Sequence, residues 1–406
     1  MSRVDAGSAT QGRLYWLDGA RAALMLLGIP FHAAMVYSIQ GWELSSPDKS
    51  PLLTALAQAS GSFRMPAFFL VAGFFAAMLL GKRPRLEFVR ARLFRLGVPL
   101  ITCLLVLSPL QVGLLEIAST ASGGTWAHSF FNAEGRVRAD AGRVWVAQLW
   151  FLIDLMLYTL VLAAVATPRV MAGLAALARR GLRLTWLGLA ALLGLHGAYS
   201  FALGAFDNLT GLHLPGPLWA AISTQKLLFN LPFFLAGALC CLERGLLASL
   251  VTWRRGTVAL AALVLLACAL WPPHGAAWQK ALRLLLLPAG AWAGAHLVLG
   301  ACARWLDRPS ALVRQLVDSS YSIYLFHIIP IFGAGLAFCW VGLPAWVEFI
   351  AIVTISLTVA WSVHGLLKRY ALYRLLFNGD ASAVLKAPTP ASEPSRGGSP
   401  ASSSLR

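Results

Sequence analysis

The chain has 406 residues, of which 58% are hydrophobic and only 12% charged, and its formal net charge is +17. Soluble globular domains are about half apolar and about a quarter charged, so this composition excludes an ordinary soluble domain. The basic residues lie in the segments between apolar runs and form no single patch, so we expect no nucleic-acid partner. The composition predicts an all-α polytopic integral membrane protein in a lipid bilayer.

Ten apolar stretches are long enough to cross a membrane and predict a bundle of about ten transmembrane helices. They cover residues 17–38, 60–81, 97–118, 144–167, 185–206, 219–241, 256–272, 281–302, 317–339 and 345–367. The first contains Asp18 and Arg21 and is too long for a signal core, so we interpret it as a retained span. The seventh is short, and His196 and Tyr199 interrupt the fifth.

The segments between the spans alternate in charge. Segments 82–95, 168–184, 242–255 and 303–315 carry 6, 4, 3 and 3 Lys/Arg residues. The other five loops hold only five, namely Lys49, Arg136, Arg138, Arg143 and Lys280. Because cytoplasmic loops are enriched in Lys and Arg, we expect both termini in the cytoplasm.

The span pattern also divides the chain. Residues 1–16 are expected to form a cytoplasmic N-terminal segment, and residues 17–370 a transmembrane domain. The Ala-, Ser- and Pro-rich residues 378–406 predict a disordered cytoplasmic tail. The loop 119–143 is the longest outer connection and is expected to cover the outer face. The six cysteines show no metal-type spacing, so we expect reduced, structural thiols and no metal site.

Ionisable side chains within the spans are expensive to insert and mark candidate functional positions. Arg21 and His32 lie eleven residues apart in LDGARAALMLLGIPFH, so they face one side of an ideal helix. Pro30 makes that phase approximate because it removes a helix hydrogen bond. Arg64, Asp154, Lys226 and His327 occupy the second, fourth, sixth and ninth spans. In straight spans, His32 would lie about 21 Å and His327 about 12 Å above the cytoplasmic edge.

Each of these groups also has a structural interpretation. Arg21 can pair with Asp18, and Arg64 or Lys226 can extend to the interface. Asp154 can neutralise one of these cations, and either histidine can be a hydrogen-bonded packing residue.

The segment KRPRLEFVRARLFRLGVP, residues 82–99, is the second strong feature. Arg92 and Arg95 are neighbours if the segment is helical, and Arg90 lies close in sequence. The segment is either an ordinary basic flank of a span or a clamp for a phosphate-rich ligand.

Four stretches follow one another along the chain in the order expected of one known family: LDGARAALMLLGIPFH, FRMPAFFLVAGFF with RARLFRLGVPL, LWFLIDLMLY, and SSYSIYLFH. Together they resemble the motifs of the membrane acyltransferase-3 family over residues 14 to about 370. The resemblance implies a multi-pass O-acyltransferase of the bacterial inner membrane. Its co-substrate would be an acyl-coenzyme A, either succinyl-CoA or acetyl-CoA, with no bound cofactor. Its acceptor would be a hydroxyl of a periplasmic glucan or another cell-envelope polysaccharide. The residues of the first two motifs are most similar to those of members that succinylate periplasmic glucans.

A sugar hydroxyl is a poor nucleophile and needs a base with a near-neutral pKa, which histidine supplies. We therefore expect His32 to act as general base or acyl carrier, with Arg64 stabilising the oxyanion or holding a distal carboxylate. His327 and Asp154 complete the expected catalytic set. The donor-binding set is Arg21, Arg90, Arg92 and Arg95. No G-x-S-x-G elbow is present, so an acyl-serine is not expected.

Two other functions remain open at this point. One is O-acetylation of a polysaccharide by an enzyme of the same family. The other is a proton-coupled transporter or exporter, in which His32, Asp154 and His327 would relay protons.

Overall fold

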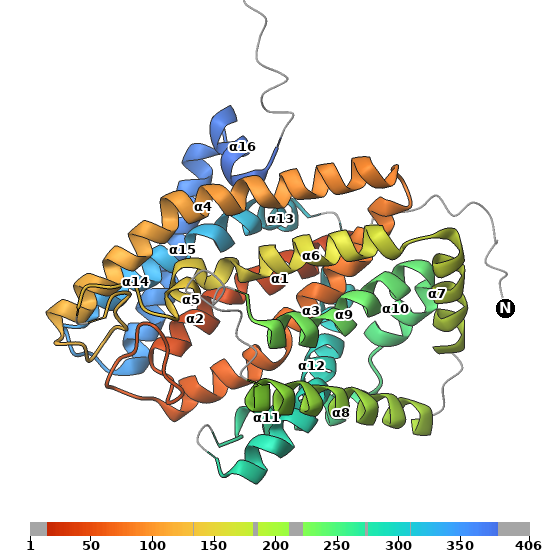
Figure 1. Ribbon diagram of the computed structural model, residues 1–406, viewed down its shortest axis with the longest axis horizontal. Coiled ribbons are helices and arrows are strands. Elements are labelled where there is room, and N and C mark those ends of the chain that lie inside the picture. The colour runs from red at the N-terminus through yellow and green to blue at the C-terminus, as the bar shows by residue number, and fades with distance from the viewer. Residues whose placement is uncertain are drawn as a thin grey trace, which may run out of the picture.

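The computed structural model describes residues 14–132, 134–181, 186–210, 222–272, 275–308 and 310–380. The predictions for the first 13 residues and for the tail beyond residue 380 therefore lie outside the described residues. Within them, every element larger than an isolated β-bridge is a helix (Figure 1). The all-α prediction is confirmed.

The helices follow one another in chain order. They are α1 (Tyr15–Leu26), α2 (Gly28–Val36), α3 (Pro51–Leu80), α4 (Arg85–Ala121), α5 (Ala141–Val146), the 3₁₀ turn η1 (Ala147–Leu149), α6 (Trp150–Val165), α7 (Pro168–Gly181), α8 (Trp186–Thr210), α9 (Thr224–Leu242), α10 (Arg244–Val251), α11 (Arg255–Ala269), α12 (Ala277–Trp305), α13 (Ala311–Phe326), α14 (Ile328–Phe338), α15 (Ala345–Leu367) and α16 (Ala371–Asn378).

The described residues hold 8 helical stretches that are long and apolar enough to cross a membrane, or up to 10 if two bent pairs each form one span. The pair α10–α11 is bent by 73° and the pair α13–α14 by 52°. These stretches match the ten predicted spans in order, so the chain is a multi-pass membrane protein. The second span was misplaced: α3 begins at Pro51, not at residue 60. Its first turns carry Thr54, Gln58 and Ser60, which are buried in the protein.

The long helix α3 lies in the middle of the bundle (Figure 1) and packs most closely against α9. A β-carbon on Gly73 would collide with the backbone carbonyl of Phe234, and one on Gly237 would collide with that of Leu70. Helix association in a bilayer depends on close van der Waals packing, which small residues allow. The two glycines therefore bring the backbones of α3 and α9 into direct contact.

Prolines within the spans leave helix carbonyls without their usual N–H donors, and side chains of neighbouring helices replace them. Pro232 cannot donate to the carbonyl of Leu228, which lies four residues earlier in α9. The hydroxyl of Tyr199 on α8 donates to that carbonyl at 2.8 Å. The irregularity in α9 therefore becomes the attachment point of α8.

We predict that Gly237→Ala destabilises the protein, because the new methyl group has to displace the α3 backbone. Overpacking of this kind costs about 1–3 kcal/mol. Thermal unfolding of the purified protein in detergent measures the effect as a lower midpoint. Gly113→Ala on α4 is the matched control, since nothing lies within 4 Å of the added β-carbon. Equal midpoints for the two variants would contradict the close α3–α9 crossing.

Candidate active site

Two proline-induced breaks bring the candidate histidines into the bundle interior. Pro30 lies three residues after Leu27, where α1 gives way to α2. Pro330 lies three residues after His327, where α13 gives way to α14. Proline has no N–H, so each break leaves the carbonyl four residues before it without its helical donor. The ring of His32 on α2 and that of His327 then meet, with centroids 5.3 Å apart.

The helix break also fixes the tautomer of His327. Its Nδ1 lies 2.6 Å from the backbone carbonyl oxygen of Tyr324, in the last turn of α13. A carbonyl only accepts hydrogen bonds, so Nδ1 carries the proton of the neutral ring and Nε2 holds the lone pair. The side chain is fully buried, and Nε2 has no hydrogen-bond partner within the described residues. His327 thus presents a proton acceptor to the bundle interior.

Arg64 on α3 supplies a buried positive charge beside the two rings. Its side chain is only 5% exposed, and its guanidinium carbon lies 4.6 Å from the centre of the Phe31 ring. A β-carbon on Gly28 would lie 3.5 Å from Arg64 Nη1 and 3.7 Å from His327 Nε2, so both nitrogens border the same spot. Across the described ranges, no carboxylate forms an ion pair with Arg64. Because an unpaired buried cation is unfavourable, the site is suited to an anionic group.

Three residues that sequence reasoning did not assign complete the surroundings of the histidines. Trp42, in the loop after α2, stacks on His32 with ring centroids 5.1 Å apart. The Tyr324 hydroxyl donates to the backbone carbonyl of Gln148 at 2.9 Å. Tyr324 lies one helical turn before His327 in SSYSIYLFH, so its spacing could have revealed it. Trp42 and Gln148 reach the site through contacts between distant segments, which no local pattern encodes.

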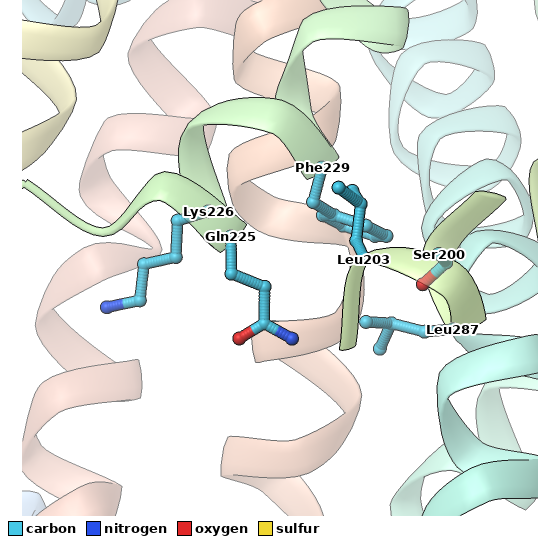
Figure 2. Close-up of a pocket in the computed structure, with 6 residues that line it drawn as sticks. All are labelled: Ser200, Leu203, Gln225, Lys226, Phe229 and Leu287. Atoms are coloured by element: carbon cyan, nitrogen blue, oxygen red, sulfur yellow. The ribbon is translucent and has the colours of Figure 1, made fainter. Parts of the chain in front are cut away.

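Asp154 and Lys226 lie on the α6–α9 side of the same region. Asp154 is buried, and its Oδ2 has no hydrogen-bond partner among the residues described. The Lys226 ammonium lies 5.1 Å from the centre of the Trp150 ring and within electrostatic range of both His32 and Asp154. Lys226 also borders an open pocket of about 160 Å³ between α8, α9 and α12 (Figure 2). The pocket is lined by Ser200, Leu203, Gln225, Lys226, Phe229 and Leu287.

The predicted donor-binding arginines are only partly brought together. Arg92 and Arg95 share a face of α4, and Arg92 lies within electrostatic range of Arg95 and Arg21. Arg92 Nε and Nη2 are buried and have no hydrogen-bond partner in the described part of the chain. Arg21 contacts Asp18 at 3.9 Å and lies 5.6 Å from the centre of the Phe75 ring. Arg90 is exposed and lies on another face of α4, since the step of two residues from Arg90 to Arg92 corresponds to about 200° of rotation.

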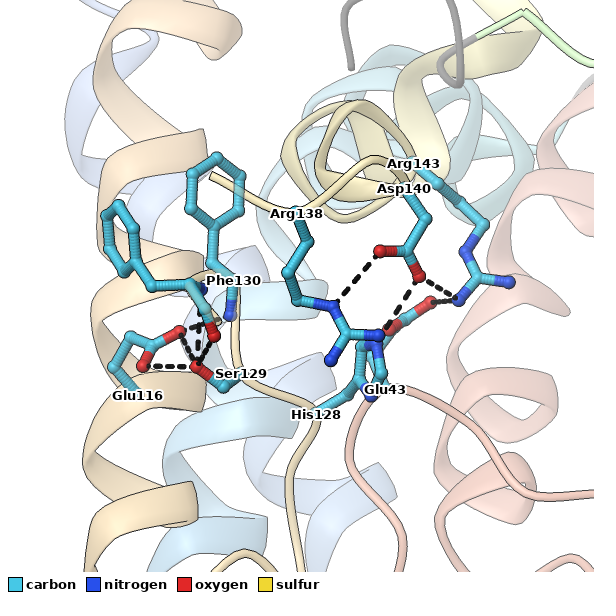
Figure 3. A network of polar contacts seen from close by, with 9 residues as sticks. Glu43, Glu116, His128, Ser129, Phe130, Arg138, Asp140 and Arg143 are labelled. Carbon is cyan, nitrogen blue, oxygen red and sulfur yellow. Dashed lines mark hydrogen bonds and ion pairs between the residues drawn. The ribbon is translucent and has the colours of Figure 1, made fainter. Parts of the chain in front are cut away.

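Two loops close the opposite end of the bundle and hold Trp42 over His32. They meet through a bridge between Leu44 and Ala127, and the N–H of His128 donates to the Glu43 carbonyl at 2.8 Å. An ion pair of 3.1 Å between Glu43 and Arg143 adds a side-chain link (Figure 3). The contact between these segments is consistent with a covering role for the loop 119–143.

Asp140 organises the second loop from within (Figure 3). It accepts hydrogen bonds from Arg138 at 3.1 Å and from His128 at 3.3 Å. Partial burial opposes ionisation of this carboxyl, but these two partners outweigh it and hold the pKa of Asp140 below its ordinary value. The stabilisation is therefore fully present at neutral pH and is lost only as the pH falls through this lowered pKa.

These features define a class: a multi-pass membrane protein with a buried imidazole pair, a buried arginine that no carboxylate of the described residues pairs with, and a cluster of arginines on α4. A family model described as an acyltransferase domain matches residues 14–365. The chain belongs to this family of acyltransferases.

Two relatives are similar over most of their length. The "Glucans biosynthesis protein C" of Escherichia coli (strain K12) is 29% identical over 377 residues, which is 90% of this chain and 94% of that protein. The protein of the same name from Salmonella agona (strain SL483) is 29% identical over 331 residues, covering 78% and 81%. No solved structure matches the chain.

We predict that Arg143→Gln loosens the contact between the two covering loops, because it removes the ion pair with Glu43 at 3.1 Å and a second pair with Asp140 at 3.6 Å. A half-exposed pair of this kind contributes at most about 1 kcal/mol, so amide exchange at Ser45 and His128 should accelerate about two- to fivefold. Hydrogen–deuterium exchange with mass spectrometry measures this. Arg136→Gln, at an exposed position of the same loop, is the control and should leave exchange unchanged.

Proposed function

We propose that this acyltransferase moves an acyl group, foremost succinyl, from cytoplasmic acyl-CoA to a hydroxyl of a periplasmic glucan. The observation that carries the proposal is the pair of interior imidazoles beside Arg64, which pairs with no carboxylate in the part of the chain that the structure describes. The name of the two relatives supports a glucan as acceptor. In this proposal the protein lies in the bacterial inner membrane with both termini in the cytoplasm.

The chemistry follows from the residues around the two rings. His32, whose Nδ1 has no hydrogen-bond partner in the described ranges, takes the proton of the glucan hydroxyl. The hydroxyl oxygen then forms a bond to the thioester carbonyl carbon, and the carbonyl oxygen becomes an oxyanion that Arg64 stabilises. Collapse of this intermediate breaks the C–S bond, and the proton passes from His32 to the departing CoA thiolate. His327 Nε2 accepts a hydrogen bond that orients the reacting groups.

The same arginine can serve a succinyl group in a second way. The free carboxylate of succinate is an anion that a buried guanidinium can bind through two parallel hydrogen bonds. An acetyl group has no such carboxylate. Transfer assays with succinyl-CoA and acetyl-CoA, read by mass spectrometry of the glucan, therefore decide between succinylation and acetylation.

At the cytoplasmic end, Arg92 and Arg95 would bind the phosphates of the donor, and Arg21 would extend this surface toward the interior. Phosphate groups pair well with arginine because the guanidinium offers several donors in a fixed plane. Arg90 is left out of this assignment because it lies about 200° around α4 from Arg92.

We predict that His32→Ala lowers kcat for succinyl transfer by about a hundredfold or more, since the reaction loses its general base. Release of free CoA from succinyl-CoA in the presence of glucan measures the rate. His296→Gln is the control, because both ring nitrogens of His296 already have partners, the Leu250 carbonyl at 2.6 Å and the Thr257 hydroxyl at 3.1 Å. A His32→Ala variant with wild-type activity would show that His32 is not the general base.

We also predict that the double variant Arg92→Ala/Arg95→Ala raises the KM for succinyl-CoA about tenfold or more while changing kcat little. The reason is that charge-assisted contacts to phosphate are lost far from the reacting bond. Lys82→Ala, an exposed residue just before α4, is the control for general loss of positive charge. An unchanged KM in the double variant removes these arginines from the donor site.

A further inference from the structure

The last helix of the described chain returns to the arginine cluster on α4. After α15 the chain turns and α16 packs against α4 and α13 (Figure 1). Ser322 on α13 donates to the Asn378 side-chain carbonyl at 2.8 Å. Tyr373 stacks on Phe326, with ring centroids 6.3 Å apart and planes at 19°. These contacts fix both the position and the rotation of α16.

The end of α16 lies directly on the backbone of Arg95. A β-carbon on Gly379 would lie 2.6 Å from the Arg95 Cα and carbonyl oxygen, and Gly379 has a φ of +60°. Only glycine fits this approach and this backbone conformation without strain. Pro99 lies four residues after Arg95 and cannot donate to its carbonyl, so this part of α4 is open to an approaching segment.

The helices α4, α13 and α16 each carry buried hydrogen-bond donors without a partner in the described part of the chain. Arg374 Nε, the Tyr321 hydroxyl and two nitrogens of Arg92 are buried and have no hydrogen-bond partner among the residues that the structure describes. Tyr321 lies within electrostatic range of Arg95. Buried donors are normally satisfied, so a group of them from three elements indicates a ligand rich in acceptor oxygens.

The direction of Arg374 follows from helix geometry. Arg374 precedes Asn378 by four residues, so both lie on one face of α16. Asn378 accepts a hydrogen bond from Ser322, the residue next to Tyr321, so this face is turned toward α13. Arg374 is therefore on the face of α16 that is turned toward α13.

We infer that α16 forms a third wall of the donor site and that Arg374, with the Tyr321 hydroxyl, binds a phosphate of acyl-CoA. This inference rests on the proposed function, because it assumes a CoA donor at Arg92 and Arg95. It adds a fourth arginine from a segment that follows all the transmembrane spans. Arg374 acts in binding and has no part in the chemical step.

The test measures binding without turnover. Full-length protein is placed in nanodiscs of zwitterionic lipid and titrated calorimetrically with coenzyme A and with 3′-dephospho-coenzyme A. Arg374→Gln should weaken coenzyme A binding about tenfold, and Tyr321→Phe, which removes only a hydroxyl, about three- to fivefold. Arg374→Lys should restore part of the affinity, because it keeps the charge but loses the planar donor set. Arg369→Gln, an exposed basic residue just before α16, should bind like the wild type.

The outcomes distinguish the proposed coenzyme A donor from the proposed role of α16. If the wild type does not bind coenzyme A, the proposed donor is wrong and the inference fails with it. If the wild type binds but folded Arg374→Gln and Tyr321→Phe variants bind equally well, only the assignment to α16 is overturned. A parallel measurement compares the thermal unfolding midpoint in zwitterionic nanodiscs and in nanodiscs that contain phosphatidylglycerol. If Arg374→Gln leaves coenzyme A binding unchanged and lowers only the midpoint in phosphatidylglycerol, the site takes a lipid headgroup and the donor assignment is again overturned. An Arg374→Gln loss that is larger for coenzyme A than for its 3′-dephospho form identifies the 3′-phosphate as the group it binds.

Discussion

The hydrogen bond between His327 Nδ1 and the Tyr324 carbonyl is the interaction on which the candidate site depends. It exists because α13 ends at Phe326, which leaves carbonyls of its last turn available to a side chain. The end of α13 in turn reflects Pro330, which cannot continue the helical hydrogen bonding. A backbone irregularity thus determines which imidazole nitrogen carries the lone pair, and it turns that nitrogen toward Arg64 and His32.

Much of this arrangement could be predicted from the sequence, because insertion into lipid makes local patterns strong. The spans, their order and the polar residues within them follow from hydropathy. The depths of the two histidines in the membrane could not be predicted in this way. Hydropathy and a straight-helix rise placed His32 and His327 at different heights, but their rings are neighbours. That estimate assumed straight spans of 1.5 Å per residue, whereas the ninth span bends by 52° at His327 itself.

The other discrepancies also come from contacts between distant segments. Residues 51–59 lie before the predicted second span, yet they form the start of α3, where Thr54 and Gln58 are buried against other parts of the protein. The packing of α16 on Arg95 brings together segments that are far apart in the sequence, which no local pattern can indicate.

The crossing of α3 and α9 has a mechanical consequence. Because their backbones touch at Gly73 and Gly237, the two helices cannot slide or rotate past each other at this crossing without a steric collision. The same two helices carry the cations Arg64 and Lys226. The imidazoles belong instead to the spans interrupted at Leu27 and His327, where the helix is weakest. The two cations therefore lie on helices locked together by direct backbone contact, whereas the two imidazoles lie beside breaks in their helices, where fewer backbone hydrogen bonds hold them.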